Sequence, residues 1–438
     1  MRQRTNRRDF LKATTAAGVG FWVAGGVSVP ESRAAIETIN FGCVGVGGKG
    51  SSDSGDAARE GNIVAICDID ENSLNKAARR YSSAQKFYDS RKMLDEMGKT
   101  IDAITVSTPD HTHTVPTALA LQQGIACYTQ KPMTHSIYEA RMLGHLAKKH
   151  KVATQMGNQG TALPNLRKAA AQIKGGCLGK VTEAHVWTNR PIWPQGMGRP
   201  EETPPCPSDI HWDLFIGPAP MRPYSPVYHP FKWRGWWDFG TGALGDMACH
   251  TLNMPFAALD LKDPISVMAK TSGHNKETYP SWSIIEYEFP ATDARPALKL
   301  FWYDGKKLPS EALLKGEKMV SSGSLIIGEK GSLYAPGDYA EKELKYLGVD
   351  APDVEYNKSP GHFKEFAQAV KGGDPAMSNF PDYASPLTET VLLGNLAVWA
   401  DGKKIEWDAQ NMVATNAPEV AEIVRPEYQN GYSLDAIT

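Results

Sequence analysis

Several features that would point to other classes of protein are scarce in this sequence. Its six cysteines stand singly, with no Cys-x-x-Cys pair of the kind that binds zinc or exchanges disulfides. Lysine and arginine number 47 against 49 aspartates and glutamates, so no excess of positive charge favours nucleic acid. No apolar run after residue 34 is long enough to cross a bilayer. The remaining composition, 41% hydrophobic and 22% charged, is ordinary for a globular protein of two or three domains.

The N-terminal residues resemble a twin-arginine export signal. Asn6-Arg7-Arg8-Asp9-Phe10-Leu11-Lys12 matches the signal pattern, and Ser32-Arg33-Ala34 has the small residues of a cleavage site. The mildly apolar stretch between them is too short for a membrane span. We therefore expect a signal peptide over residues 1–34, a twin-arginine translocase as partner, and a periplasmic or secreted protein. The alternative is a disordered basic tail.

Short apolar runs alternate with helical patterns from residue 39 to residue 156. This alternation is typical of a parallel α/β sheet, and it predicts a Rossmann domain over residues 35–157. The predicted strands are Ile39–Val46, Ile63–Ile66, Ile101–Ser107, Ala126–Thr129 and Val152–Met156. The predicted helices are Asp53–Glu60, Ser73–Tyr81, Val115–Gln122 and Ile137–His150, the last opened by a Ser136/Glu139 capping box.

The pattern changes after Gly157. Proline and aromatic residues crowd the stretch from Pro191 to Pro230, which predicts a long irregular loop. Strand-like runs then dominate, at Ser266–Thr271, Trp282–Phe289, Ala297–Tyr303 and Ser324–Ile327, with helical patterns at Leu166–Ile173, Gly361–Val370 and Leu387–Trp399. Residues 158–438 are therefore expected to form an α+β domain with a large, mostly antiparallel open sheet.

A glycine-rich turn follows the first predicted strand. Gly45-Val46-Gly47-Gly48-Lys49-Gly50 is a Gly-x-Gly-x-x-Gly that closes a strand and opens a helix. The first glycine permits the turn, the second lets the backbone approach a pyrophosphate, and the third lets helix and strand pack closely. Gly45, Gly47, Gly48 and Gly50 are therefore candidate cofactor-binding residues; the alternative is an ordinary loop.

An acidic residue ends the second predicted strand. Asp68 stands where a carboxylate would accept hydrogen bonds from a ribose hydroxyl and repel a 2′-phosphate, so NAD is favoured over NADP. The alternative is an aspartate that caps a turn.

Two further stretches, together with the glycine motif, resemble the Gfo/Idh/MocA oxidoreductase family. One runs from Ser107-Thr108-Pro109-Asp110-His111-Thr112-His113 to Gln130-Lys131-Pro132, and the other is Gly242-Ala243-Leu244-Gly245-Asp246-Met247-Ala248-Cys249-His250. The resemblance covers nearly everything after residue 35. It implies an NAD-dependent oxidoreductase that acts on CH–OH groups of a sugar, sugar derivative or cyclitol, and it implies a homo-oligomer.

The resemblance also implies roles for individual residues. Thr108, Pro109 and His113 would line the nicotinamide pocket, Lys131 would contact substrate and nicotinamide, and Asp246 and His250 would supply an acid/base pair. The chemistry agrees, because hydride leaves a carbinol carbon only when the hydroxyl proton is removed, and histidine is the natural base. A spacing of four residues puts Asp246 and His250 on one helix face, where Asp246 could orient the ring or share the proton. The alternatives are a helix-capping Asp246, a core His250 and a solvated Lys131.

Two departures from simple expectation stand near Lys131. The family usually has Glu before Lys-Pro, and the Gln130 found here predicts that Lys131 loses its proton more readily and that Gln130→Glu shifts the pH profile. His111 and His113 form a His-x-His that resembles a metal motif, but no further ligands stand nearby in the sequence, so we expect no metal.

Aromatic residues precede the Asp246 segment. Aromatic faces pack against the C–H faces of sugar rings, so we expect Trp236 and Trp237, with Arg234 and His211, to contact the substrate. The alternative for the tryptophans is packing inside the long loop or at a subunit contact.

An exported enzyme would meet no fresh NAD outside the cytoplasm, so the cofactor would be tightly bound and recycled. Three outcomes fit: coupled oxidation and reduction of two sugars, transient oxidation that enables elimination, epimerisation or glycoside cleavage, and electron transfer to an outside acceptor. A redox-neutral glycosidase, lyase or epimerase is the second interpretation, although the resemblance implies that the glycosidase branch lacks the Lys131 equivalent. A non-catalytic NAD-binding scaffold is the third.

Overall fold

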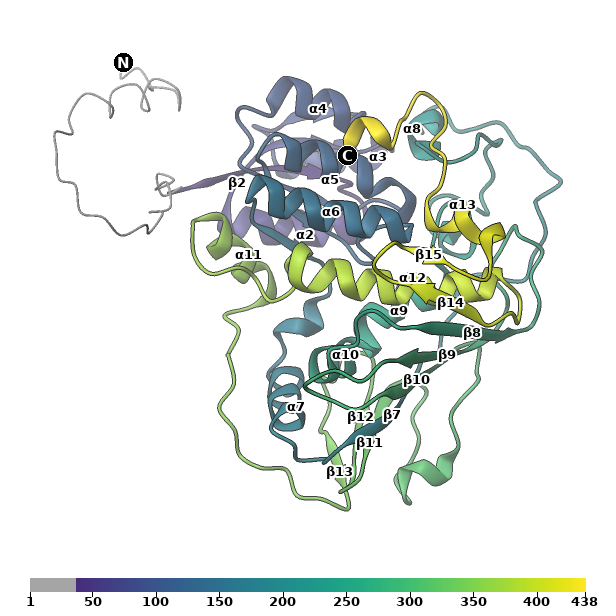
Figure 1. Cartoon of the computed structure of the whole chain (residues 1–438). Helices are drawn as coiled ribbons and strands as arrows, with labels where there is room; N and C mark the ends of the chain where they lie inside the picture. The colour runs from purple at the N-terminus through teal and green to yellow at the C-terminus, as the bar shows by residue number, and fades with distance from the viewer. Residues whose placement is uncertain (1–36) are drawn as a thin grey trace, which may run out of the picture. The chain divides into compact units, whose positions relative to one another are not determined.

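The computed structural model describes residues 37–438, and the predicted twin-arginine signal lies outside this range. Within it, the predicted fold class is confirmed: a parallel α/β sheet is followed by a domain with a mostly antiparallel sheet (Figure 1). Of the helices in residues 37–438, none is long and apolar enough to cross a membrane.

The first domain is a six-stranded parallel sheet in the order β3-β2-β1-β4-β5-β6. Its strands are β1 (Ile39–Val44), β2 (Gly61–Cys67), β3 (Gln85–Phe87), β4 (Ala103–Val106), β5 (Ala126–Thr129) and β6 (Thr154–Met156). Its helices are α2 (Gly48–Glu60), α3 (Glu71–Arg80), α4 (Ser90–Met97), α5 (Thr114–Gln122) and α6 (Ile137–His150). The predicted capping box at the start of α6 is present. The order reverses at β1, and ligands bind at such a reversal, beyond the carboxyl ends of the strands.

The second domain is built on a nine-stranded sheet in the order β13-β12-β11-β7-β10-β9-β8-β14-β15. Its paired strands are antiparallel except for β7 and β10. The strands are β7 (Val181–Trp187), β8 (Ser266–Thr271), β9 (Ser283–Phe289), β10 (Leu298–Tyr303), β11 (Gly323–Gly328), β12 (Ser332–Pro336), β13 (Lys345–Leu347), β14 (Ile405–Asp408) and β15 (Val413–Ala414). The helices are α7 (Pro164–Lys174), α8 (Trp212–Ile216), α9 (Gly242–Thr251), α10 (Asn253–Leu259), α11 (His362–Val370), α12 (Ser385–Trp399) and α13 (Ala421–Val424).

Helix α12 joins the two domains. It contacts α6 of the first domain on one side and α9 and strand β8 of the second on the other. Its residues from Leu387 to Val398 are all buried, which explains why its apolar residues are not confined to one face. Helix α9, which carries Asp246 and His250, is thereby connected to the first domain through α12.

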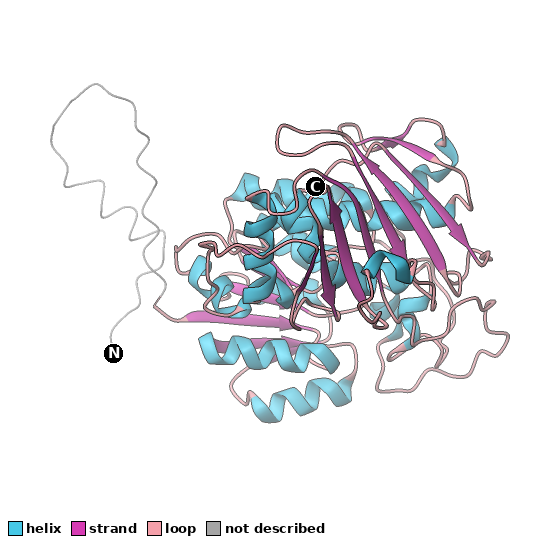
Figure 2. Cartoon of the chain, turned by 90° about the horizontal axis from the view of Figure 1, so that it is seen from below, coloured by secondary structure: helices cyan, strands magenta, loops and turns pink. Residues whose placement is uncertain are grey.

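One face of the large sheet is covered by helices, and much of the other is open (Figure 2). Strand β9 alternates between buried and half-buried residues, as expected when one face packs on a core. The open face carries charged pairs such as Lys299 with Glu286 and Glu288. A separate small core containing Trp187 and Leu314 closes one end of the sheet.

The stretch from Pro191 to Pro230, expected to be wholly irregular, contains the short helix α8 and helps to form a core of its own. Phe215, Ile216, Tyr228, Trp236 and Phe239 are buried together in it. The proline-rich chain packs on these rings, so it is an ordered subdomain beside the cofactor-binding edge.

Candidate functional site

A single cavity of about 700 Å³ runs from the glycine turn to helix α9. Residues from both domains line it, and its size suits a small-molecule ligand. Eleven predicted site residues stand on its wall: Gly45, Gly47, Gly48, Asp68, Thr108, Pro109, His113, Lys131, Arg234, Asp246 and His250. The structure therefore brings most of the predicted site together.

The glycine turn fits a dinucleotide. Gly45 has a φ of +76°, and a Cβ there would lie 2.6 Å from the carbonyl oxygen of Ser107. A Cβ on Gly50, which lies outside the cavity wall, would lie 1.9 Å from the carbonyl oxygen of Gly45, so only glycine lets α2 begin this close to β1. The amides at the start of α2 are left to meet phosphate charge.

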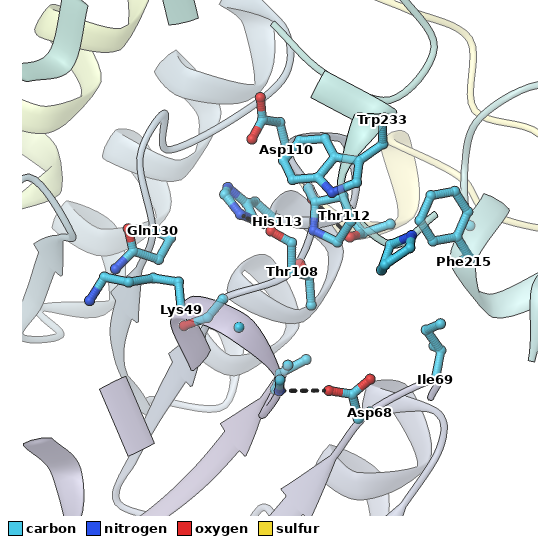
Figure 3. Close-up of a pocket in the computed structure, with 18 of the residues that line it drawn as sticks. Lys49, Asp68, Ile69, Thr108, Asp110, Thr112, His113, Gln130, Phe215 and Trp233 are labelled. Atoms are coloured by element: carbon cyan, nitrogen blue, oxygen red, sulfur yellow. Dashed lines mark hydrogen bonds between the residues drawn. The ribbon is translucent and has the colours of Figure 1, made fainter. Parts of the chain in front are cut away.

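Asp68 closes this end of the cavity. Its carboxylate accepts hydrogen bonds from the backbone amides of Val46 (2.8 Å) and Gly47 (3.1 Å), as Figure 3 shows in part. Burial raises the pKa of Asp68, and its backbone hydrogen bonds act in the opposite direction. The carboxylate is therefore fixed beside the glycine turn, where it could bind a ribose diol.

His113 has a structural function at the cavity wall. Its ring nitrogens lie 2.8 Å from the carbonyl oxygen of Thr108 and 2.9 Å from that of Pro132. The ring thus joins the turn after β4 to the turn that carries Lys131. His111 likewise faces the carbonyl oxygens of Phe215 and Phe239. Within residues 37–438 no group of His, Cys, Asp or Glu side chains is arranged to hold a metal.

Lys131 and Asp246, far apart in the sequence, form an ion pair at the inner end of the cavity. The Nζ of Lys131 donates 2.8 Å hydrogen bonds to the Oδ1 and the backbone oxygen of Asp246. Burial disfavours the charged carboxylate, but Lys131 and Arg234 outweigh this and hold the pKa of Asp246 well below its usual range. Asp246 therefore stays ionised and anchors Lys131. Within residues 37–438 no hydrogen bond joins Asp246 to the His250 ring, so the expected orientation of that ring by Asp246 is not seen.

His250 is a buried imidazole at the inner end of the cavity. Its Nδ1 is buried with no hydrogen-bond partner in the described chain, and its ring meets that of Tyr339 at 4.6 Å. Burial, followed by the charge of Lys131, lowers the pKa of His250 well below its ordinary value. A neutral imidazole can accept a proton from a hydroxyl at neutral pH.

Gln130 does not act on the Lys131 ammonium as its sequence position suggested. Its amide nitrogen donates a 2.8 Å hydrogen bond to Asp53, a fully buried residue of α2. Lys49 and Ser107 complete the ring of partners around Asp53. Lys131 pairs with the carboxylate of Asp246. Gln130, which stands where the family usually has glutamate, pairs with the carboxylate of Asp53 instead.

The hydrogen bond between Gln130 and Asp53 predicts that a change at one position can be compensated by a change at the other. Gln130→Glu places two carboxylates face to face, and we expect it to lower the free energy of unfolding by about 2 kcal/mol. Asp53→Asn in the same chain restores an amide–carboxylate hydrogen bond with reversed roles and should recover most of the loss. Urea denaturation of the two single variants and the double variant measures the coupling. Additive effects of the two changes would contradict the pairing.

Three predicted substrate contacts lie off the cavity wall. Trp236 is 1% exposed and its indole nitrogen donates to the carbonyl oxygen of Val227. Trp237 stacks on Tyr279 at 3.7 Å. His211 stacks on Tyr88 at 4.1 Å and lies 3.1 Å from a carboxylate oxygen of Glu71, which ties the loop to the first domain. Trp236 is buried in the core formed with the loop, and Trp237 is buried in the main hydrophobic core, so their expected contact with substrate is not supported.

Other residues also line the wall. Trp233 and Arg190 stand there, and Arg190 lies 3.7 Å from Asp246. Tyr339, which follows β12, and Tyr432, in the C-terminal tail, were not singled out as site residues. Figure 3 shows Trp233 and Phe215 across the cavity from Lys49 and Gln130. No local motif marks Tyr339 or Tyr432; only the fold brings them here.

Comparisons with protein families match both domains. The NAD-binding Rossmann-fold model of the Gfo/Idh/MocA oxidoreductase family matches residues 39–158, and that family's C-terminal alpha/beta domain model matches residues 181–434.

Curated relatives match over shorter segments. A glycosyl hydrolase family 109 protein of Solibacter usitatus is 28% identical over 152 residues, which are 31% of this chain and 35% of that protein. The rhizopine catabolism protein MocA of Rhizobium meliloti is 26% identical over 125 residues, 28% of this chain and 39% of that protein. The chain thus spans little more than a third of each of these relatives.

Solved structures share the fold over most of the chain. The WlbA dehydrogenase of Bordetella pertussis, in complex with NADH and UDP-GlcNAcA, has a TM-score of 0.60 at 17% identity and covers 85% of this chain and 99% of its own. An inositol dehydrogenase homolog of Azotobacter vinelandii, complexed with NADH and myo-inositol, has a TM-score of 0.57 at 16% identity, with coverages of 85% and 98%.

Proposed function

The chain belongs to the Gfo/Idh/MocA family of NAD-binding oxidoreductases, and from this premise we propose that it oxidises a CH–OH group of a sugar, sugar derivative or cyclitol with a tightly held NAD. One observation carries the proposal. The cavity that begins at the glycine turn and Asp68 ends at Lys131, Asp246 and His250. A dinucleotide site and a hydroxyl-activating site therefore share one enclosed space.

The residues at the inner end divide the chemistry between them. NAD, when bound, accepts the hydride, which is the C–H hydrogen with its electron pair. The hydroxyl proton passes to the neutral imidazole of His250 as the C=O bond forms. The Lys131 ammonium, held by Asp246, donates a hydrogen bond to the oxygen on which negative charge develops.

The compounds bound by structural relatives support the substrate class. The WlbA dehydrogenase was crystallised with a sugar nucleotide and the inositol dehydrogenase homolog with a cyclitol. Both were solved with NADH. We propose the same broad class of hydroxylated ring for this chain.

Residues 209–219 around α8, which we call the roof, line the cofactor end of the cavity and support tight retention of NAD. The segment around α8 is tied to the first domain by the hydrogen bond from the Glu71 amide to the Asp209 carbonyl oxygen (2.9 Å). The C-terminal tail, which passes beside α8 in Figure 1, is tied to the roof in turn. There the Asn430 side-chain nitrogen donates to the carbonyl oxygens of Gly217 (2.9 Å) and Ala219 (2.7 Å). Release of a dinucleotide would require these contacts to break.

The roof predicts a change in cofactor release. Asn430→Gly removes both side-chain hydrogen bonds and keeps the backbone conformation, whose φ is +56°. We expect release of bound NADH to accelerate about tenfold or more, because roughly 1 kcal/mol is lost per hydrogen bond. Release is followed by fluorescence after mixing with excess NAD. Asn411→Gly, at an exposed turn, is the control, and an unchanged rate in Asn430→Gly would argue against the roof.

The cofactor itself is tested directly. The full chain, purified from the periplasm, is denatured and the released nucleotide is identified by mass. Near-stoichiometric NAD or NADH is the expected result, whereas NADP would overturn the role of Asp68. Absence of any nucleotide would contradict retention. The same preparation shows whether residues 1–34 direct export and are removed.

A redox-neutral reaction is the second candidate, and the similarity to a glycosyl hydrolase family 109 protein favours it. In that case oxidation would be transient, and a later step would return the hydride to the substrate. Analysis of products from a glycoside substrate distinguishes the two, since a net oxidation yields a ketone or lactone and the redox-neutral route yields a cleaved or isomerised sugar.

We further propose that the chain is a homo-oligomer that associates through the open face of the large sheet. Charged pairs such as Lys299 with Glu286 are available on that face. Light scattering on the purified full chain should give a mass of at least two copies.

A further inference from the structure

Positive side chains outnumber negative ones at the inner end of the cavity. Lys131, Arg234 and Arg190 all approach the carboxylate of Asp246, at 2.8, 3.3 and 3.7 Å. The second carboxylate at this end, Asp110, is 1% exposed and lies 3.2 Å from Arg234. Three cations on the cavity wall thus face two anions.

The surrounding histidines do not alter this balance. Burial lowers the pKa of both His113 and His250, so both rings are neutral at neutral pH. The cavity wall around Asp246 therefore keeps one positive charge in excess. A charge that is partly shielded from water requires a partner, and in an enzyme that partner can be the ligand.

Arg190 is the cation with unused donors. Its side chain is 23% exposed, and the 3.7 Å approach to Asp246 is too long for a hydrogen bond. In the described part of the chain, its guanidinium donates one hydrogen bond, to the side-chain oxygen of Asn189. Its other N–H groups can therefore form the two parallel hydrogen bonds that a carboxylate accepts from arginine.

Arg234 forms a rigid wall beside it. Its guanidinium lies 4.2 Å from the centre of the Trp233 ring and 5.6 Å from that of Trp193. Asp110, which binds it, is itself fixed by a 2.6 Å hydrogen bond from Thr241. This positive surface is built into the fold and does not depend on flexible side chains.

We propose that the substrate is an acid of the sugar or cyclitol class, and that Arg190, with Arg234 beside it, binds its carboxylate. The hydroxyl to be oxidised then lies against Lys131 and His250. This inference rests on the proposed function and adds the charge of the substrate to it. Arg190 is a specificity-determining residue in this account, because a neutral sugar would leave its N–H groups without a charged acceptor.

The test compares pairs of ligands that differ in one carboxylate. Binding of D-glucuronate and D-glucose, and of D-galacturonate and D-galactose, is measured by quenching of NADH fluorescence on the holoenzyme. We expect the acid to bind about tenfold tighter or more in at least one pair, and Arg190→Gln to weaken that acid about tenfold while the neutral sugar changes less than about twofold. Arg190→Lys keeps the charge without the planar guanidinium, so its affinity for the acid should lie between those of the wild type and Arg190→Gln. Arg59→Gln, at an exposed pair with Asp56, is the matched control.

Two results overturn the proposal: neutral sugars that bind as tightly as their acids, and acids that do not bind at all. Equal weakening of acid and neutral sugar by Arg190→Gln would also overturn it. Because fluorescence quenching reports binding without turnover, failure of the proposed function can be distinguished from failure of this inference. Acids that bind without being oxidised count against the proposed function, and oxidation of neutral sugars alone counts against this inference.

Discussion

Replacing His250 by asparagine is expected to lower kcat by about 10²- to 10⁴-fold, the usual contribution of a general base. The buried imidazole stands at the inner end of the cavity, and its low pKa keeps it neutral and ready to accept a proton. Asparagine fills similar space but cannot take the proton. Steady-state rates with the substrate found in the ligand screen measure the effect.

NAD content should stay unchanged in this variant, because the glycine turn and Asp68 lie at the other end of the cavity. His145→Asn, on the exposed side of α6, is the control and should retain full activity. A His250→Asn protein with normal turnover and normal NAD content would remove His250 from the chemistry.

Replacing Lys131 by methionine should change both the rate and its pH dependence. Loss of the hydrogen bond to the developing oxyanion is expected to lower kcat by about 10²- to 10³-fold. The pH dependence follows from the charge next to His250. Lys131 disfavours the imidazolium, so its removal raises the pKa of His250.

The direction of the pH shift follows from the protonation state in which His250 is active. His250 must be neutral to accept a proton, and the wild-type acid limb of kcat/KM should lie well below the ordinary histidine pKa. In Lys131→Met that limb should move to higher pH. The pH dependence of His250 modification by diethylpyrocarbonate gives the same pKa without turnover. Lys330→Met, at an exposed turn, is the control, and a limb that moves to lower pH would contradict the ion-pair arrangement.

The parallel sheet was predictable because its main strands are continuous apolar runs between glycine-rich turns. The predicted helix Ile137–His150 agrees with α6 at both ends, and its capping box marked the first of them in the sequence. Strand β3 and helix α4 were missed. Residues 85–87 bury one side chain only, so they leave no apolar run to recognise.

The sequence indicated which residues stand at the inner end of the cavity but not their contacts. The spacing on α9 suggested that Asp246 faces His250, whereas the carboxylate turns to Lys131, a contact over 115 positions that no local pattern encodes. The expected contact of the tryptophans with substrate was not supported, for another reason. Aromatic content predicts contact with a sugar and packing of a loop equally well, and Trp236 and Trp237 serve the packing.

The excess of positive charge that we connect to the substrate could not be read from the sequence. Arg190 and Arg234 come from different segments, after β7 and before α9, and both approach Asp246 only in the folded chain. Charge in a cavity is a sum over distant segments, so it is visible only once the fold is known.

The central claim is that one cavity binds NAD and activates a hydroxyl. The most direct measurement is the near-ultraviolet absorbance of nicotinamide on the purified holoenzyme during titration with sugars and sugar acids. We predict that at least one compound reduces the bound NAD on nearly every chain, and that His250→Asn, with the same NAD content, shows no such change. A wild-type enzyme that holds NAD but shows no absorbance change with any compound would contradict the account.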